Sequence, residues 1–378
     1  MAQGAYVGVD GKARKIVSGY VSVSDKARKI TKAYIGIGGK ARPCWSIGGK
    51  ELSYYGAITT LYNARANLAA TSVGNYAIFG GGQTSSTAVT NRACCYDTSL
   101  TRTSKTLDTS KHSLAATTVG NYALFGGGRT SSSSSKTMCS FDTSLTRSTA
   151  TELSIARQDL AATTVGDYAL FGGGSGSTLY SSTVDSYNKS LTLGSPSSLS
   201  TGRYNLSATT VGDYALFGGG IVSTFGANSS PSNIVDAYDK SLTRSTPASL
   251  SYKSTDLVAA QVGGYALFAG GYTGSMFLAY GDAYNTSLTK THISLSANRR
   301  NLAATTIGDY ILLGGGEGQS GALNVVDAFD RSLTRSTTNL NTARYNLAAA
   351  SVGNYAIFAG GQTDASTYSK VTEAYTVM

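Results

Sequence analysis

Basic side chains recur at nearly equal intervals along most of this 378-residue chain. They are Arg65, Lys111, Arg157, Arg203, Arg299 and Arg344, with Lys253 displaced by one residue from the corresponding place. Converging guanidinium groups suit carboxylate or phosphate, so one hypothesis is a site for an anion or an acidic glycan. The alternative, which we favour, is that each basic side chain bonds backbone carbonyls or an acid of its own repeat. Those acids are Asp185, Asp236, Asp282, Asp327 and Glu373.

A second set of candidates lies in the loops where the repeats differ from one another. Variable loops on one face of a rigid repeat commonly form a binding surface, and aromatic side chains there would stack on sugar rings or pack on a protein. Ordinary loop variation is the alternative. Together with three of the arginines, the candidate ligand-binding residues are Arg203, Tyr204, Phe225, Asn228, Tyr272, Phe277, Arg299, Arg300, Arg344, Tyr345 and Tyr368.

Catalytic and metal chemistry has little support in the sequence. Only two histidines are present, His112 and His292, and no nucleophile pattern surrounds them. The four cysteines form no CxxC pair, so a zinc site is not expected and we expect all four to be reduced. The sequence leaves open whether two of its carboxylates form the catalytic pair of a glycosidase. We expect no catalytic residue, no metal and no cofactor.

The candidate residues are positioned by a unit that occurs seven times, numbered here as copies one to seven. Its central stretch in copy one reads Val-Gly-Asn-Tyr-Ala-Ile-Phe-Gly-Gly-Gly, from Val73 to Gly82. A fixed period of this kind indicates one supersecondary unit that is copied along or around an axis. The tyrosine recurs at Tyr76, Tyr122, Tyr168, Tyr214, Tyr265, Tyr310 and Tyr355.

Each copy predicts four β-strands, and units of 40 to 50 residues with four strands favour a β-propeller. The first strand of every copy carries small residues, such as Ala161 and Ala162, as expected of strands that crowd a central axis. Copy seven ends after its third strand, and the segment 54–61 lies where its fourth strand would be expected. We therefore predict an all-β fold in which residues 51–378 form a seven-bladed propeller, closed by a strand at about 54–61.

Residues 1–50 predict a separate module of small β-hairpins. Three units repeat every 14 residues, with tyrosines at Tyr6, Tyr20 and Tyr34. The segment has ten basic and two acidic residues, so its charge is +8 out of +10 for the chain. Three short hairpins bury little, so we expect attachment or oligomerisation through other chains, and nucleic-acid binding is unlikely. The candidate assembly residues are Lys12, Arg14, Lys26, Arg28, Lys40, Arg42 and Trp45.

The long repeat resembles kelch repeats. The resemblance rests on a tyrosine followed by apolar residues and Gly-Gly, then Val-Asp-x-Tyr-Asp, then an arginine, over about 328 residues. The tryptophan usual after the Tyr-Asp turn is replaced by Ser-Leu-Thr-Arg, Ser241 to Arg244 in copy four, and we expect Leu242 to take over the packing between blades. The N-terminal units, such as Ala-Tyr-Val-Gly-Val-Asp-Gly-Lys-Ala-Arg-Lys-Ile, resemble leader segments of tail-associated structural proteins in phages and prophages of Gram-positive bacteria.

This second resemblance implies a virion component that is anchored through its N-terminus. We expect a non-enzymatic tail or fibre protein whose propeller binds a bacterial surface polysaccharide or protein, whose residues 1–50 contact other virion proteins, and which forms a homo-oligomer on the particle. No signal peptide and no membrane insertion are expected, so synthesis would be in the bacterial cytoplasm. The alternatives are an intracellular kelch-type protein-interaction scaffold, a carbohydrate-active enzyme, and a purely architectural virion protein.

Overall fold

The computed structural model describes residues 6–9, 12–15, 19–23, 26–30, 32–37, 40–46, 51–176, 180–222 and 230–377. These residues form strands and connections, with no helix among them and so none that would span a membrane. The first three hairpins pair β1 (Tyr6–Val9) with β2 (Lys12–Lys15), β3 (Gly19–Val23) with β4 (Lys26–Ile30), and β5 (Lys32–Ile37) with β6 (Lys40–Ser46). The side chains of the candidate assembly residues lie outside the described part.

Seven antiparallel sheets of four strands each follow within the described residues, one for each copy of the repeat. Sheets one to four contain β8 (Ala69–Val73), β9 (Tyr76–Gly80), β10 (Arg92–Asp97) and β11 (Arg102–Thr106); β12 (Ala115–Val119), β13 (Tyr122–Gly126), β14 (Met138–Asp142) and β15 (Arg147–Thr149); β16 (Ala161–Val165), β17 (Tyr168–Gly172), β18 (Val184–Asn188) and β19 (Leu193–Gly194); β21 (Ser207–Val211), β22 (Tyr214–Gly218), β25 (Val235–Asp239) and β26 (Arg244–Ser245).

Sheets five to seven contain β27 (Val258–Val262), β28 (Tyr265–Ala269), β29 (Tyr280–Asn285) and β30 (Lys290–Ser294); β31 (Ala303–Ile307), β32 (Tyr310–Gly314), β35 (Val325–Asp330) and β36 (Arg335–Asn339); β37 (Ala348–Val352), β38 (Tyr355–Ala359), β39 (Thr372–Val377) and β7 (Leu52–Ala57). Short strands lie in the connections: β20 (Arg203–Tyr204), β23 (Ile221–Val222), β24 (Ser230–Pro231), β33 (Glu317–Gly318) and β34 (Gly321–Ala322).

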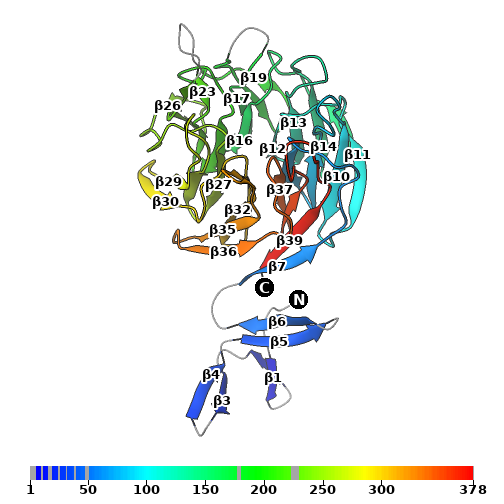
Figure 1. Cartoon of the computed structure of the whole chain (residues 1–378), viewed down its shortest axis with the longest axis vertical. Helices are drawn as coiled ribbons and strands as arrows, with labels where there is room; N and C mark the ends of the chain where they lie inside the picture. Colours follow the sequence, from blue (N-terminus) through cyan, green and yellow to red (C-terminus); the bar gives the residue numbers. More distant parts are fainter. Residues whose placement is uncertain are drawn as a thin grey trace.

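The first strands of the sheets contact one another in a closed cycle, β8 to β12, β16, β21, β27, β31, β37 and back to β8. Their small residues allow this close approach, and threonine hydroxyls join neighbouring strands. The Oγ1 atoms of Thr117 and Thr164 lie 2.9 Å apart, and those of Thr163 and Thr210 also lie 2.9 Å apart. The sheets therefore surround a common axis in a propeller-like arrangement (Figure 1).

The last sheet joins the two ends of the repeat region, because β39 pairs with β7 and Tyr375 lies opposite Tyr54 (Figure 1). The strand runs from Leu52 to Ala57, so it begins two residues before the predicted segment 54–61 and ends earlier. Beyond it the chain stays attached to the neighbouring segment, since Ile58 N donates to Thr372 O (2.9 Å) and Leu61 N donates to Lys370 O (2.9 Å).

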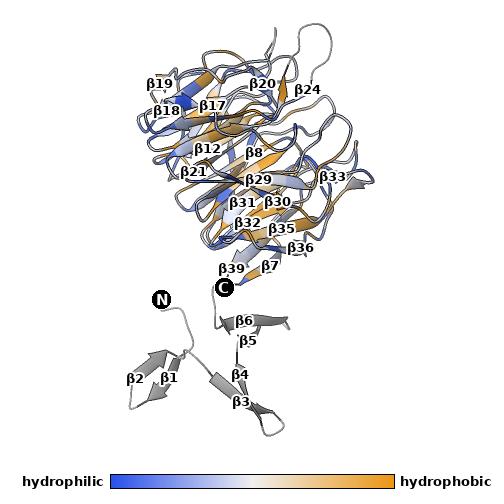
Figure 2. Ribbon diagram, turned by 90° about the vertical axis from the view of Figure 1, so that its left-hand side faces the viewer, coloured by the Kyte–Doolittle hydropathy of each residue, from blue (hydrophilic) through white to orange (hydrophobic). Residues whose placement is uncertain are grey.

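The core consists of layers between adjacent sheets, and hydrophobic residues follow the strands (Figure 2). Between sheets three and four, Leu170 and Val184 pack with Phe217 and Tyr238, and Leu242 packs against this cluster. The glycine runs make room for these side chains, because a Cβ atom on Gly172 would lie only 2.7 Å from Phe217 Cε1 of the next sheet. The three described cysteines, Cys94, Cys95 and Cys139, are free and buried.

Candidate functional site

The repeated basic side chains are buried. Arg65, Arg157, Arg203, Arg299 and Arg344 are 0% exposed, and Lys111 is 1% exposed. We call these six residues the anchor residues. Arg203, Arg299 and Arg344, which the sequence offered as ligand-binding residues, do not face solvent and do not form a charged mouth. The residue that follows each of these arginines in the chain lies nearer that surface.

The anchor residues bind groups inside their own sheets. Arg299 Nη2 donates to Asp327 Oδ2 (2.6 Å), and its Nη1 donates to Val325 O (2.6 Å) and Gly315 O (2.9 Å). The arginines of copies three, four and seven pair in the same way with Asp185, Asp236 and Glu373. Burial lowers the pKa of Arg299 to about 10, and the Asp327 carboxylate offsets part of that effect. Their geometry is that of structural ion pairs.

A second repeated position lies two residues after each anchor position and faces the axis. Its members have left-handed backbone with φ between 51° and 56°. Asn and Asp tolerate this conformation better than most residues, which explains their prevalence here. We call this set the axial ring. It consists of Asn67, Ser113, Asp159, Asn205, Asp256, Asn301 and Asn346.

Backbone hydrogen bonds join the axial ring into a closed cycle. The amide of each member donates to the carbonyl of the preceding member, as Ser113 N does to Asn67 O (3.0 Å). The cycle closes where Asn67 N donates to Asn346 O (3.0 Å). Because every link is a backbone bond, the side chains are free to differ while their positions are held by the fold.

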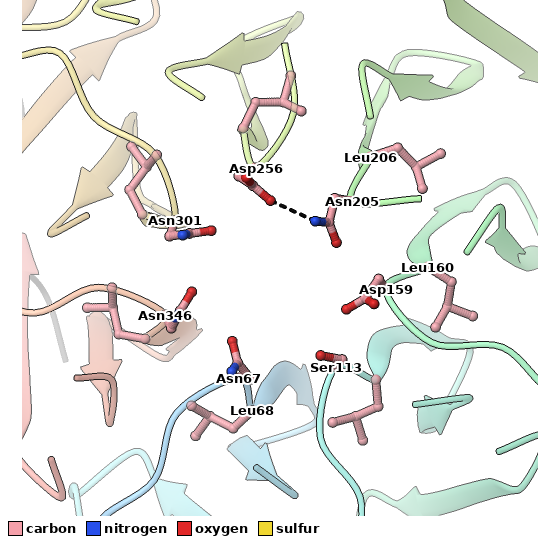
Figure 3. A pocket seen from close by; sticks show the side chains of 14 residues that line it. Asn67, Leu68, Ser113, Asp159, Leu160, Asn205, Leu206, Asp256, Asn301 and Asn346 are labelled. Atoms are coloured by element: carbon pink, nitrogen blue, oxygen red, sulfur yellow. Dashed lines mark hydrogen bonds between the residues drawn. The ribbon is translucent and has the colours of Figure 1, made fainter. Parts of the chain in front are cut away.

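The axial ring lines a cavity of about 220 Å³ on the axis, together with the leucine that follows each member. Figure 3 shows the amide and carboxylate groups directed toward a common centre. Asn205 Nδ2 donates to Asp256 Oδ1 (2.9 Å) across one side of the ring. The cavity thus offers both donors and acceptors around a space that is open to solvent.

The two carboxylates of the axial ring give it a distinct electrostatic character. Burial raises the pKa of Asp256 to about 6, Arg300 opposes the rise, and the nearby carboxylates of Asp159 and Glu317 add to it. Asp256 therefore takes up a proton much more readily than an exposed carboxyl group does. The two carboxylates lie on one side of the ring, on either side of Asn205, and the amides of Asn301, Asn346 and Asn67 lie on the other.

A collar of variable residues surrounds the axial ring. It is formed by the residue between each anchor position and each ring residue: Ala66, His112, Gln158, Tyr204, Thr255, Arg300 and Tyr345. Each pairs in a β-bridge or short strand with a residue that follows a glycine run, as Arg300 does with Glu317 and Tyr345 with Gln362. The collar is where the copies present different chemistry at equivalent places.

Six of the eleven predicted ligand-binding residues belong to the collar or to the loops that contact it. Arg300 Nε donates to Glu317 Oε2 (2.9 Å), and its guanidinium lies 5.1 Å from the Tyr272 ring and 5.3 Å from the Phe277 ring. The Tyr204 ring lies 4.6 Å from that of Tyr180, and Tyr368 is bridged to Gln362, the partner of Tyr345. Phe225 and Asn228 lie outside the described residues.

Sequence reasoning missed the axial ring itself. The signal was present as a basic residue, a variable residue, then Asn, Asp or Ser, then Leu, as in Arg203-Tyr204-Asn205-Leu206. A left-handed position cannot be read from side-chain periodicity, because the repeat of Asn and Asp is also explained by ordinary turns.

No family model and no curated protein matches this chain. Among solved structures, the chain is similar to the one described as "Structure of YjhT", with 12% sequence identity and a TM-score of 0.56. The likeness covers 72% of this chain and 95% of that chain. At this identity it concerns the fold alone, and it supports the propeller-like reading of the four-stranded sheets.

Proposed function

We propose that this protein is a phage tail or fibre component whose seven-bladed, kelch-like propeller binds a bacterial surface glycan at the axial ring. The observation that carries the proposal is the ring itself: seven polar side chains, held by a closed cycle of backbone bonds, that line a cavity of about 220 Å³. The sheets repeat with little change, whereas the collar residues differ from copy to copy. The differences between copies therefore surround this one cavity.

The chemistry of the axial ring suits a polyhydroxylated ligand. Sugar hydroxyls both donate and accept hydrogen bonds, and a ring of amides with two carboxylates offers the complementary groups. The collar adds aromatic faces, of which Tyr204 and Tyr345 stand beside ring residues Asn205 and Asn346. The cavity is smaller than a drug-sized site of about 300 Å³ or more, so a single sugar unit at the end or side branch of a polymer fits best.

Attachment to the particle is assigned to residues 1–50. The basis is the threefold hairpin unit, its resemblance to tail-associated leader segments, and its charge of +8. Several copies on one particle would convert weak single sites into firm adhesion, since linked sites bind as an effectively concentrated array. This part of the proposal requires the chain to be present in purified particles, and its absence from them would overturn it.

Glycan binding is tested with Asn301→Ser, because Ser113 shows that serine is accepted at the same backbone geometry. The matched control is Asn339→Ser on the exposed outer strand β36. We expect wild type to bind a polysaccharide of the host surface, Asn301→Ser to bind it about 5- to 10-fold more weakly because one hydrogen bond is lost, and the control to bind normally. Equal binding by all three proteins, or no binding by wild type, would contradict the proposal. The measurement is calorimetric titration of the full chain.

A further inference from the structure

Two exposed tyrosines lie side by side on sheet five, away from the axial ring. Tyr252, in the connection before the sheet, is 44% exposed, and Tyr280, at the start of β29, is 43% exposed. Their rings stack with centres 5.1 Å apart and planes 19° from parallel. The imidazole of His292 in β30 lies 5.4 Å from the Tyr280 ring. We call these three residues the aromatic platform.

We propose that the aromatic platform binds a neutral pyranose chain whose ring substituents are equatorial, such as a chain of β-1,4-linked glucose. Sugars of this kind present C–H groups on the faces of the ring, and these pack on aromatic side chains. Their hydroxyls lie at the rim and form hydrogen bonds with polar groups beside the aromatic surface. The site is separate from the axial ring and does not depend on the function proposed above.

The strand register places the ligand-binding groups on one face of the sheet. Tyr280 and Asp282 are two residues apart in β29, and His292 lies directly opposite Asp282 in β30. Because side chains alternate between the two faces of a strand, all three share a face. His292 Nδ1 lies 3.7 Å from Asp282 Oδ1, which leaves Nε2 for a sugar hydroxyl. Stacking holds the rings in place before a ligand arrives, so binding costs less conformational entropy.

The other copies show that the scaffold does not need these rings. The register aligns Tyr280 with Arg92, Thr137, Thr183, Ile234, Val325 and Val371. It aligns His292 with Ser104, Thr149 and Thr337. Tyr252 and Tyr280 also line a cavity of about 10 Å³, but closing so small a space does not require rings that stay more than two-fifths exposed. The platform is therefore peculiar to copy five.

The charges around the platform nearly cancel, which favours a neutral ligand. Lys290 Nζ lies 3.8 Å from Asp282 Oδ1 and donates to Ser251 Oγ (3.0 Å). Lys253, in the connection before the sheet, is exposed and adds one cation. Binding of a nucleic acid depends on several contacts between cations and phosphates, and one cation is too few for them.

The surroundings of the platform are too polar for an interface with another protein. Ser251 precedes Tyr252 in the chain, Ser294 lies opposite Tyr280, and both serines are exposed. A stable protein interface buries about 800 Å² on each partner around an apolar core. Two half-exposed tyrosines supply only a small part of such a core, whereas one sugar chain needs no larger apolar surface.

The two histidines of the chain report on the two candidate sites separately, because His292 belongs to the platform and His112 to the collar. The test titrates cellohexaose into the full chain labelled with ¹³C-histidine and follows the imidazole signals by NMR at fixed pH. His112→Gln assigns the signals, since glutamine occurs at this place in copy three, as Gln158. We expect a saturable shift of the His292 signal. A shift of His112 alone would overturn this proposal while it supports the axial ring, and no shift of either signal would overturn this proposal.

Tyr280→Val tests the rings themselves, because valine occupies the equivalent place in copies six and seven. Its control is Tyr62→Val, which removes a tyrosine that is 54% exposed from the connection before sheet one. We expect Tyr280→Val to bind cellohexaose about tenfold more weakly, and we expect the control and Tyr252→Phe, which keeps the ring, to bind as wild type does. Equal losses in Tyr280→Val and Tyr62→Val would overturn the platform as a site. A shift of His292 by single-stranded oligothymidine at a lower concentration than cellohexaose would overturn the choice of a neutral chain.

Discussion

Copies five and six hold an equivalent buried carboxylate, one without and one with a buried arginine beside it. In copy six, Asp327 pairs with the fully buried Arg299 at 2.6 Å. Asp327 also accepts a hydrogen bond from Ser296 N (3.1 Å) and lies 3.6 Å from Nε of the partly exposed Arg335. In copy five the anchor position is Ser254, which supplies no cation, and Asp282 accepts hydrogen bonds from Ser251 N (2.6 Å) and Ser251 Oγ (2.8 Å). Two groups near the surface, Lys290 Nζ and His292 Nδ1, lie 3.8 Å and 3.7 Å from Asp282 Oδ1.

The anchor arginine is therefore one of two ways in which a sheet satisfies the same buried polar groups. Ser254 Oγ donates to Gly270 O (3.0 Å), just as Arg299 Nη1 donates to Gly315 O (2.9 Å) in the next copy. Equivalent carbonyls thus receive a hydrogen bond in both copies. In copy five a cavity of about 10 Å³, room for about one water, lies beside Ser254 and Asp282. A position that can exchange arginine for serine in this way serves the sheet and not a ligand.

Removal of the cation in copy six should have the largest effect on stability. Arg299→Met removes the buried cation beside Asp327 and leaves only Ser296 N and the partly exposed Arg335 near that carboxylate. Loss of one partner from a buried ion pair typically costs about 3–5 kcal/mol. Ser254→Ala in copy five removes one neutral hydrogen bond, for which we expect about 1 kcal/mol. The free energy of unfolding from denaturant curves measures both. Losses of equal size would mean that the two copies do not differ in the way described.

The sequence predicted the parts of this comparison that depend on local pattern. Strand alternation and the period of the repeat indicated four strands per copy, and the hypothesis that arginines bond acids of their own repeat named Asp327. The partners of Asp282 were not predictable, because Lys290 and His292 approach it only through the register of β29 with β30, where Asp282 lies opposite His292. The axial ring was missed for a related reason, since its members meet only when all seven copies surround one axis.

Copies five and six also differ in the axial ring, where copy five has Asp256 and copy six has Asn301. Because Asp256 can titrate and Asn301 cannot, we expect copy five to make the stability of the protein depend on pH. The folded state raises the pKa of Asp256 to about 6, against about 3.9 when unfolded. The folded protein therefore binds the proton more tightly, so this contribution to stability is present below about pH 4 and is lost as the pH rises through 6.

Asp256→Asn should remove that dependence while it keeps a residue that other copies accept at this position. We expect the variant to match wild type near pH 4 and to be more stable by about 2 kcal/mol at pH 7.5. Unfolding free energies of both proteins at pH 4, 6 and 7.5 test this. Asn301→Asp, the reverse change in copy six, should lose stability as pH rises. A difference between wild type and Asp256→Asn that does not vary with pH would contradict the account.

The smallest expected effect is that of Asp282→Asn, and it tests the comparison most closely. The amide oxygen keeps one of the two bonds from Ser251, and the lost partners Lys290 and His292 are partly exposed, so we expect a loss of about 1 kcal/mol. Asp327→Asn leaves Arg299 buried and unpaired, so its loss should be several times larger. Added salt should shrink the first loss and leave the second nearly unchanged, because salt screens exposed charges and not buried ones. A large loss for Asp282→Asn that does not change with salt would contradict this account. It would mean that the Asp282 carboxylate depends on buried partners, as Asp327 does, and not on the exposed Lys290 and His292.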